Sequence, residues 1–431
     1  MPNQKMKSAT NKKKVLIIVE NLPIPNDRRV WLEATTLHNA GFHVSVISIK
    51  GEKAIKSFEV LEGIQVYRYP APPSTSGMMS FLFEFAYCWL MTLYLSIVIA
   101  LREGIDIIHA CNPPDTFWLI AWIYKPLGVK FIFDHHDLSP EMYYSRFENR
   151  GLVYRILVWL EFLTFRTADV VITTNDTHRR IAIERGKFSP DRIFIVRSGP
   201  DHNKLRPGKP DSSLKGNHKY MVSYLGVLNP QDGVDIYIKT AEIIFRKFMR
   251  DDILFVIMGT GDSEESLRTF SNELGLDDHV RFTGWLDQVQ YSSYLSTSEI
   301  CVDTMPKTPY GDAATMNKIL EYMSTARPIV SFDLVETRAS AQEAALYAKP
   351  NDLMNFAEKI LYLLEDEKLR MEMGAAGRRR IETELAWKYQ VPNLLAAYDS
   401  LESGIKTNRS EYPRDEIDIS DPKSIAKDTE L

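Results

Sequence analysis

Cysteine is scarce in this chain of 431 residues, which has only Cys88, Cys111 and Cys301. The number is odd, and no two of them have a C-x-x-C or other zinc-site spacing. The sequence therefore predicts neither a disulfide framework nor a structural zinc site. Such sparse use of cysteine is typical of a reducing compartment, and we expect a cytoplasmic protein.

An excess of positive charge is also lacking. The chain has 52 lysines and arginines against 57 aspartates and glutamates, a formal net charge of -5. Nucleic-acid-binding domains use a basic field to neutralise phosphates, so we expect no nucleic-acid partner. Only 21 glycines and 22 prolines occur and 45% of the residues are hydrophobic, which excludes a collagen-like or largely disordered chain. A globular protein of two or three domains remains.

The sequence has one long uncharged run, FAYCWLMTLYLSIVIAL at residues 85–101. The run falls short of the roughly 20 residues that span a bilayer. We expect a buried or membrane-facing helix, with a true span as the alternative. The lysine-rich segment 1–13 precedes no apolar core of a signal peptide, and we expect a basic disordered tail. The polar segment 403–431 also has the composition of a disordered tail.

Short apolar runs alternate with helix-length segments through the rest of the chain. The first run, KVLIIVEN at 14–21, is continuously apolar, as strands buried on both faces are. The alternation predicts an α/β fold of doubly wound parallel sheets. A punctuated polar stretch predicts a linker at 204–219, between a domain at 14–203 and a second at 220–385, and the amphipathic segment 386–402 predicts a helix that packs back across the first. Ligands of such sheets bind outside the carboxyl ends of the strands, so we expect the functional site in the cleft between the domains.

The most informative segment is GDAATMNKILEYMSTARPIV at 311–330. A loop of small residues leads into a predicted helix that begins near Met316, and Asn317 and Glu321 share one face of it. The free N–H groups at a helix start suit a diphosphate, and Glu321 can accept hydrogen bonds from the two hydroxyls of a ribose. Lys318 can add positive charge. Alternatively, Lys318 and Glu321 belong to a solvated helix face.

This segment resembles the donor-site helix of glycosyltransferase family 4, whose members have the GT-B fold. The family pattern is E-x7-E before an apolar strand, and one version reads Pro-Asn-Lys-Leu-Phe-Glu-Tyr-Met, to which MNKILEYM at 316–323 is close. Glu321 matches the second glutamate, but Ala313 stands where the first is expected. The resemblance implies two Rossmann-like domains that face each other across a cleft, with the nucleotide sugar held by the second.

Two glycine-containing loops of the second domain also fit the resemblance. In YLGVLNPQDG the family carries an arginine and a lysine that neutralise the diphosphate, and here Val227 and Asp232 stand in those places. Positive charge is then expected from Arg197 or Lys318. Hydrogen-bond donors remain at Gly226, Asn229, Gln231 and Gly233, with a simple turn as the alternative.

The segment MGTG places Gly259 and Gly261 at the end of a strand. Close approach of the backbone to the nucleotide, as the family implies, and turn geometry alone both stay open. Trp285 and Leu286 resemble the wall that holds the nucleotide base.

Three histidines lie in or directly after strands of the first domain. His109 fits the first position of a His-x-His that marks the family's first-domain site, Cys111 replaces the second, and His135 and His136 follow on the next strand. The resemblance implies that the histidines line the reacting sugar and the acceptor; buried structural histidines are the alternative. We do not expect Cys111 to be a nucleophile, since it lacks an evident base. The chain has no Asp-x-Asp, and we expect neither a metal nor a cofactor.

The first strand-to-helix loop, PIPNDRRVW, carries Asn26 and Arg28 near the place where the family binds acceptor and phosphate. We expect these two residues, with Asn112 and Asp115 of the CNPPD segment, to bind the acceptor. Arg28 or Arg29 can hold an acceptor pyrophosphate, and a solvent-exposed arginine is the alternative.

Together these features predict a retaining, hexosyltransferase-like enzyme that moves a sugar from a nucleotide-diphosphate donor to an acceptor hydroxyl in the assembly of a surface polysaccharide or another glycan. The expected partners are a nucleotide sugar, a glycan or lipid-linked acceptor and, peripherally, the inner face of the membrane. Two other functions stay open. A non-catalytic nucleotide-sugar-binding subunit of a polysaccharide assembly complex would explain Ala313, Val227 and Asp232. A sugar-nucleotide epimerase or hydrolase would use the same scaffold.

Overall fold

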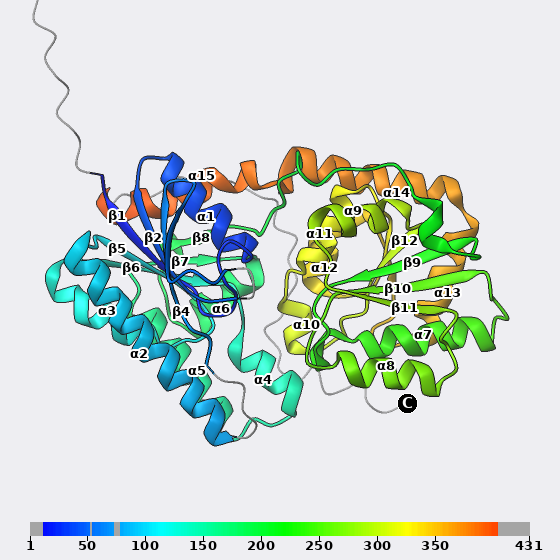
Figure 1. Cartoon of the computed structure of the whole chain (residues 1–431), viewed down its shortest axis with the longest axis horizontal. Coiled ribbons are helices and arrows are strands. Elements are labelled where there is room, and N and C mark those ends of the chain that lie inside the picture. The colour runs from blue at the N-terminus through cyan, green and yellow to red at the C-terminus, as the bar shows by residue number, and fades with distance from the viewer. Residues whose placement is uncertain (1–11, 52–53, 73–77, 404–431) are drawn as a thin grey trace, which may run out of the picture.

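The computed structural model describes residues 12–51, 54–72 and 78–403. Except for residues 12, 13 and 403, the two predicted tails lie outside this range. The described chain forms two lobes that lie side by side, each with a central sheet between layers of helices (Figure 1). The sequence prediction of two doubly wound α/β domains is confirmed.

The N-terminal lobe is built on eight strands in the order β3-β4-β2-β1-β5-β6-β7-β8. The strands are β1 (Lys14–Ile18), β2 (His43–Ile49), β3 (Phe58–Leu61), β4 (Ile64–Tyr69), β5 (Ile107–Cys111), β6 (Lys130–His135), β7 (Val170–Thr173) and β8 (Ile193–Ile195). The helices are α1 (Arg28–Asn39), α2 (Met78–Arg102), α3 (Trp118–Tyr124), α4 (Ser139–Phe147), α5 (Leu152–Thr167) and α6 (Asp176–Glu184). Strand β3 pairs antiparallel with β4, whereas the other pairings are parallel. The sequence analysis did not predict β3, a short edge strand that is half exposed.

The C-terminal lobe has six parallel strands in the order β11-β10-β9-β12-β13-β14. The strands are β9 (Tyr220–Leu225), β10 (Ile253–Met258), β11 (Val280–Gly284), β12 (Ile300–Asp303), β13 (Ile329–Phe332) and β14 (Ala345–Ala348). The helices are α7 (Val234–Arg246), α8 (Glu264–Glu273), α9 (Gln288–Thr297), α10 (Pro309–Ala313), α11 (Asn317–Ser324), α12 (Val335–Ala341), α13 (Leu353–Glu365) and α14 (Glu367–Arg380). Strand β10 is buried along its whole length, which explains its continuous apolar sequence.

The last described helix, α15 (Trp387–Ser403), returns to the N-terminal lobe (Figure 1). The indole Nε1 of Trp387 donates a hydrogen bond to Thr36 Oγ1 at 2.9 Å, and Leu394 and Ala397 are part of that lobe's core. The linker is attached to the other lobe, since the backbone N–H of Gly208 donates to Ser296 Oγ at 2.9 Å. Both connections between the lobes are therefore held by side chains.

Helix α2 contains the long uncharged run and packs on β2 and β4 of the N-terminal lobe's sheet (Figure 1). Its Ser96 Oγ lies 3.0 Å from the Tyr124 hydroxyl of α3. Within the described residues, its segment Phe83–Arg102 is the one stretch long and apolar enough to cross a membrane, with a mean hydropathy of 1.7 and 22% of it buried. The buried side chains of α2, among those described, are Cys88, Thr92, Ser96 and Ile99. Several large apolar side chains of the helix face outward, where a surface helix usually carries polar side chains.

Candidate functional site at the interlobe surface

Side chains that follow the carboxyl ends of strands join the two lobes. Arg28, after β1, forms an ion pair with Glu321 of α11. Asn175, after β7, donates from Nδ2 to the carbonyl oxygen of Ala313 and to Thr315 Oγ1, both at 2.8 Å. We call the region defined by these contacts the interlobe surface. It lies where ligands of open α/β sheets bind.

A second set of contacts extends this surface. Thr177 Oγ1, at the start of α6, donates to Glu336 Oε1 at 2.7 Å. On the same side, Arg197 Nη1 lies 3.9 Å from Glu336 Oε2 and Nη2 lies 3.8 Å from Asp176. Within the described residues, Nη1 of Arg197 is buried and has no hydrogen-bond acceptor. Arg197 therefore lies at the lobe boundary with unused donor capacity.

Helix α11 presents Glu321 to the interlobe surface. The helix begins at Asn317, which is exposed, and buries Leu320 and Tyr322 against its own lobe. The carboxylate of Glu321 is 12% exposed, and besides Arg28 it has the Tyr291 hydroxyl at 3.5 Å. The helix start near Met316 and the orientation of Glu321 agree with the geometry expected from the sequence.

Lys318 does not lie at the surface. Its side chain is 8% exposed, and Nζ donates to the Tyr224 hydroxyl at 2.9 Å and lies 3.6 Å from Asp303. Burial alone would lower the pKa of Lys318, but Tyr224, Asp303 and Asp232 raise it above the usual lysine value, so the ammonium stays charged. The alternative of a solvated helix face needs correction, because the Lys318 side chain is buried behind the Gly226 loop.

The glycines of the two loops are required by close packing. A Cβ at Gly259, whose φ is +136°, would lie 1.9 Å from the carbonyl oxygen of Gly226. A Cβ at Gly261 would lie 2.6 Å from the backbone of Leu228, and one at Gly233 would lie 2.1 Å from the carbonyl oxygen of Thr304. These approaches allow the ends of β9 and β10 to pack together. Close packing therefore requires glycine at these three positions whether or not a ligand binds.

The remaining donor-side residues are partly engaged. Asn229 and Asp232 cap the turn that they flank, with the Asn229 N–H donating to Asp232 Oδ2 at 3.2 Å. Oε1 of Gln231 is buried and has no partner within the described residues. Trp285 is 60% exposed, and Leu286 packs against the C-terminal core.

Two of the three predicted histidines lie inside the N-terminal lobe. His109 has its Nδ1 2.7 Å from the Tyr398 hydroxyl, and His135 has its Nε2 3.0 Å from Glu161. Both side chains are fully buried. The prediction that they line the reacting sugar needs correction, since neither side chain reaches the interlobe surface.

His136 differs from the other two because 14% of its side chain is exposed. Its Nδ1 lies 3.1 Å from Asp134 Oδ2. Burial would lower the pKa of His136, but the carboxylate of Asp134 raises it to about 9. His136 is therefore positively charged at neutral pH.

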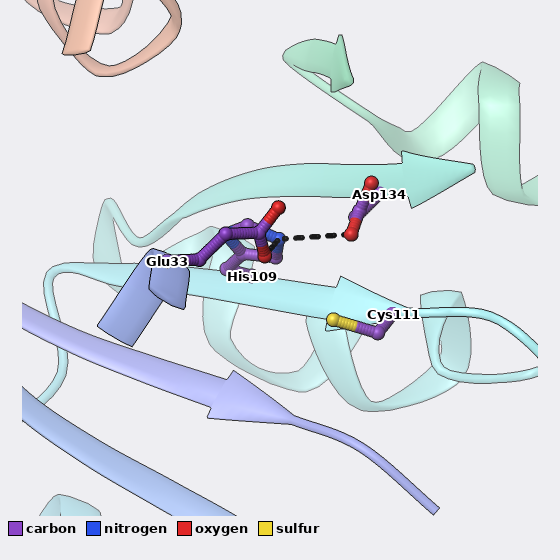
Figure 2. Close-up of side chains that lie close together, drawn as sticks. All are labelled: Glu33, His109, Cys111 and Asp134. Carbon is purple, nitrogen blue, oxygen red and sulfur yellow. Dashed lines mark ion pairs between the residues drawn. The ribbon is translucent and has the colours of Figure 1, made fainter. Parts of the chain in front are cut away.

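Figure 2 shows a buried cluster formed by Glu33, His109, Cys111 and Asp134, from α1, β5 and β6. Their ligand atoms lie within 4.8 Å of one another, a donor set that can hold a metal ion. Arg29 already engages the carboxylates, however: Nε and Nη2 donate to Asp134 at 2.9 and 2.7 Å, and Nη2 lies 3.2 Å from Glu33.

Two neighbouring cations act on the carboxyl groups of this cluster. Arg29 and its neighbour His136 hold the pKa of Asp134 well below its usual range despite burial, whereas burial and Asp134 raise the pKa of Glu33 to about 7. Two cations thus face two carboxyl groups, and a metal ion would have to displace Arg29. Burial also raises the pKa of the Cys111 thiol well above its usual value, which makes a thiolate unfavourable.

The predicted acceptor residues divide into two groups. Asn112 and Asp115 are buried and bind each other, with Nδ2 of Asn112 donating to Asp115 at 3.1 Å, while Asn112 Oδ1 accepts from the His136 N–H at 2.9 Å. Burial and Glu161 raise the pKa of Asp115 to about 6. These two residues tie the loops after β5 and β6 together, so their assignment as acceptor ligands needs correction. Asn26 is exposed.

Sequence reasoning missed Asn175, Glu336 and Tyr291. Asn175 also caps α6, since its Oδ1 accepts from the His178 N–H, and a capping role was its only visible signal. Glu336 and Tyr291 lie on ordinary helices, and no local pattern distinguishes them.

Comparisons with known proteins cover both lobes. Residues 27–199 match the family described as "Glycosyl transferase 4-like domain", and residues 219–366 match "Glycosyl transferases group 1". The chain is 24% identical over 351 residues to an uncharacterized glycosyltransferase of Haemophilus influenzae, which covers 80% of this chain and 88% of the relative.

Two solved structures illustrate the similarity of fold. Sucrose-phosphate synthase from Thermosynechococcus elongatus superposes with a TM-score of 0.74 at 16% identity, over 91% of this chain and 100% of that one. HepE from Anabaena, in complex with UDP-glucose, superposes with a TM-score of 0.68 at 15% identity, over 90% of this chain and 99% of that one. The two-lobed arrangement is thus shared along nearly the whole described chain.

Proposed function

The chain belongs to the family 4-like glycosyltransferases of the GT-B fold, and on this premise we propose that it transfers a hexosyl group from a nucleotide-diphosphate donor to an acceptor hydroxyl, with retention of configuration. The observation that carries the proposal is the position of Glu321. Its carboxylate lies on the C-terminal lobe, at the interlobe surface, one turn beyond an exposed helix start. That spacing suits the ribose and the diphosphate of one ligand.

The donor would lie with its ribose on Glu321 and its diphosphate at the N-terminus of α11. The first N–H groups of a helix have no partners within the helix, and those of α11 would donate to the diphosphate. Lys318 adds a buried positive charge behind the Gly226 loop. The neighbour HepE was solved with UDP-glucose, which supports a nucleotide sugar as the donor class.

The reaction would depend on charge stabilisation and on positioning. The bond between the anomeric carbon and the diphosphate oxygen breaks, and the acceptor oxygen bonds to that carbon on the face from which the diphosphate leaves. The acceptor's hydroxyl proton passes to the departing diphosphate, on which negative charge develops. His136, which is protonated at neutral pH, and Arg197 are the cations of the N-terminal lobe that would stabilise it. Closure of the lobes would orient the acceptor hydroxyl and exclude water.

We further propose that the transfer needs neither a metal nor a cofactor. The side chains named above supply the positive charge that a metal would otherwise provide, and Arg29 occupies both carboxylates of the buried cluster. Turnover should then be unchanged after prolonged dialysis against EDTA. Loss of turnover that Mg²⁺, Mn²⁺ or Zn²⁺ restores would contradict this proposal.

The acceptor is proposed to be a glycan or lipid-linked glycan that a cytoplasmic enzyme meets at the inner face of the membrane. Exposed apolar side chains of three adjacent helices form what we call the outer apolar face. They are Phe83, Leu90, Tyr94, Ile97 and Leu101 of α2, Leu119, Trp122 and Ile123 of α3, and Leu152, Val153, Ile156 and Trp159 of α5. Exposed apolar side chains gathered on neighbouring helices are typical of a lipid or protein contact. Arg102, Arg155 and Arg166 are exposed on the same helices and would favour anionic lipid.

Vesicle flotation tests the membrane contact. Wild-type protein should float with vesicles that contain anionic phospholipid, and the double variant Leu90→Gln, Ile97→Gln should not. The matched control is Met249→Gln, Met371→Gln, which removes two apolar side chains of the C-terminal lobe that are 80% and 69% exposed. Equal flotation of both variants, or dimerisation of the wild type through this face, would contradict the proposal.

Donor binding tests the main proposal. A nucleotide sugar that binds the folded state raises the melting temperature by mass action, so a panel of UDP-, GDP- and ADP-sugars should identify the donor. Glu321→Gln should remove the shift, whereas Glu372→Gln, a control on the exposed face of α14 in the same lobe, should keep it. A full shift with Glu321→Gln would show that the donor site is misplaced.

A second candidate function is a non-catalytic nucleotide-sugar-binding subunit. The observation that favours it is Ala313, whose carbonyl oxygen accepts from Asn175 and which offers no carboxylate to the donor sugar. Release of nucleoside diphosphate that depends on an added acceptor would exclude this function. Donor binding without any release across a panel of glycan acceptors would support it.

A further inference from the structure

Arg28 covers the carboxylate that the proposed donor site needs. As the first residue of α1 it belongs to the N-terminal lobe, and it pairs with Glu321 of the opposite lobe. The Arg28 side chain keeps 35% of its area exposed, against 12% for Glu321. A ribose can therefore reach Glu321 fully only after the guanidinium has moved, and the exposure of Arg28 leaves it room to move.

The loop that would hold the diphosphate has no cation of its own. Residues 226–233 contain neither lysine nor arginine, and Asp232 adds a carboxylate. Lys318 lies behind the loop, with its ammonium bound to Tyr224 and close to Asp303. A diphosphate carries about two negative charges and binds best where a guanidinium can donate to it directly. The C-terminal lobe by itself does not place one there.

We propose that Arg28 is a ligand of the donor diphosphate that exchanges partners when the donor binds. The ribose hydroxyls take its place on Glu321, and the guanidinium turns to the diphosphate, which lies one helical turn away in the same ligand. No charge is left unpaired by this exchange, because Glu321 gains two hydrogen bonds and Arg28 gains an anion. This inference rests on the proposed donor site. It replaces the expectation that Arg28 binds an acceptor pyrophosphate.

The exchange predicts different effects of Arg28 on the affinity for a nucleoside and on the affinity for a nucleoside diphosphate. A nucleoside must break the Arg28 contact and offers nothing in return, whereas a nucleoside diphosphate supplies a new partner. Arg28 therefore weakens the binding of a nucleoside and strengthens the binding of a nucleoside diphosphate. Because Arg28 belongs to the other lobe, the diphosphate rather than the base links the two lobes.

Calorimetric titration with uridine, UMP and UDP tests the proposal, with the guanosine and adenosine series run in parallel. Arg28→Ala should bind UDP roughly 10- to 100-fold more weakly than wild type, the scale of one lost charge-assisted hydrogen bond. The same variant should bind uridine as tightly as wild type or more tightly. Arg28→Lys keeps the charge without the planar guanidinium, and its affinity for UDP should lie between those of wild type and Arg28→Ala. Arg166→Ala, an exposed arginine of α5, should change neither affinity.

The outcomes separate this inference from the proposed function. Equal weakening of uridine and UDP by Arg28→Ala, or no change in either, would overturn the role of Arg28 while the donor site stands. If wild-type protein binds no member of the uridine, guanosine or adenosine series, both proposals fail. If Arg28→Ala proves unstable, Arg28→Lys decides: weaker UDP binding with unchanged uridine binding supports the exchange, and unchanged UDP binding overturns it.

Discussion

Arg29 is the side chain whose removal should damage the N-terminal lobe most. It is 6% exposed and donates to Asp134 through two nitrogens, to the carbonyl oxygen of Val196 at 2.7 Å and to Ser198 at 3.2 Å. It also pairs with Glu33. Arg29→Met keeps much of the apolar stem but removes the charge and all five donors. The variant leaves two carboxyl groups buried without their cation.

The expected loss follows from these contacts. Removing one partner of a buried ion pair costs about 3–5 kcal/mol, because the other partner stays buried without compensation. For a lobe of this size each kcal/mol lowers the melting temperature by roughly 2–4 °C. We therefore expect Arg29→Met to lower the melting temperature by roughly 6–20 °C. Arg28→Met is the matched control at the neighbouring position. The one ion pair of Arg28 is more exposed, so the melting temperature of this variant should fall far less.

Differential scanning calorimetry at several pH values is the assay. In wild type, Arg29 holds the pKa of Asp134 low, so this carboxylate stabilises the fold above its ordinary pKa and the stabilisation is lost as the pH falls. In Arg29→Met the buried carboxyl groups favour protonation instead, and the deficit should shrink as the pH falls from 8 toward 5. A decrease in melting temperature below roughly 3 °C would refute this explanation of the cluster, and so would a difference between variant and wild type that grows as the pH falls.

Three further predictions concern single side chains. The pKa of His136 in the folded protein is about 9, above its value in the unfolded chain. Its contribution to stability is therefore complete below about pH 6.5 and is lost as the pH rises through 9. His136→Gln should flatten this part of the profile of stability against pH, and an unchanged profile would contradict the assignment. Gly259→Ala should abolish donor binding and lower stability because of the 1.9 Å contact, whereas Gly275→Ala, which has a positive φ but open space, should keep donor binding in the same thermal-shift assay. Cys111→Ser should keep its rate of nucleoside diphosphate release, and a loss above roughly tenfold would revive a covalent mechanism.

The sequence was sufficient to predict the fold because strand signals are local. The first apolar run, at 14–21, contains strand β1 as expected, since burial on both faces demands a continuous apolar run. The omission, β3, is four residues long and lies at the sheet edge, where one face needs no apolar side chain. Helix α11 was also placed well, because its start follows a loop of small residues.

The site was harder to predict because side-chain direction and partner are not local. His109 lies within β5, and whether its ring points into the lobe or out of the sheet edge depends on Tyr398, nearly 290 positions later. The burial of Lys318 depends on Tyr224 and Asp303, which belong to two other strands. Asn175 looks like a simple helix cap until the second lobe brings Ala313 against it. Only the packed structure distinguishes these roles.

The most direct test of the donor site is a crystal structure with the nucleoside diphosphate that the thermal-shift panel selects. The account predicts that both ribose hydroxyls lie within hydrogen-bond distance of the Glu321 carboxylate and that the diphosphate lies at the first N–H groups of α11. A nucleotide bound away from α11, or one bound while Glu321 contacts no part of it, would contradict the account.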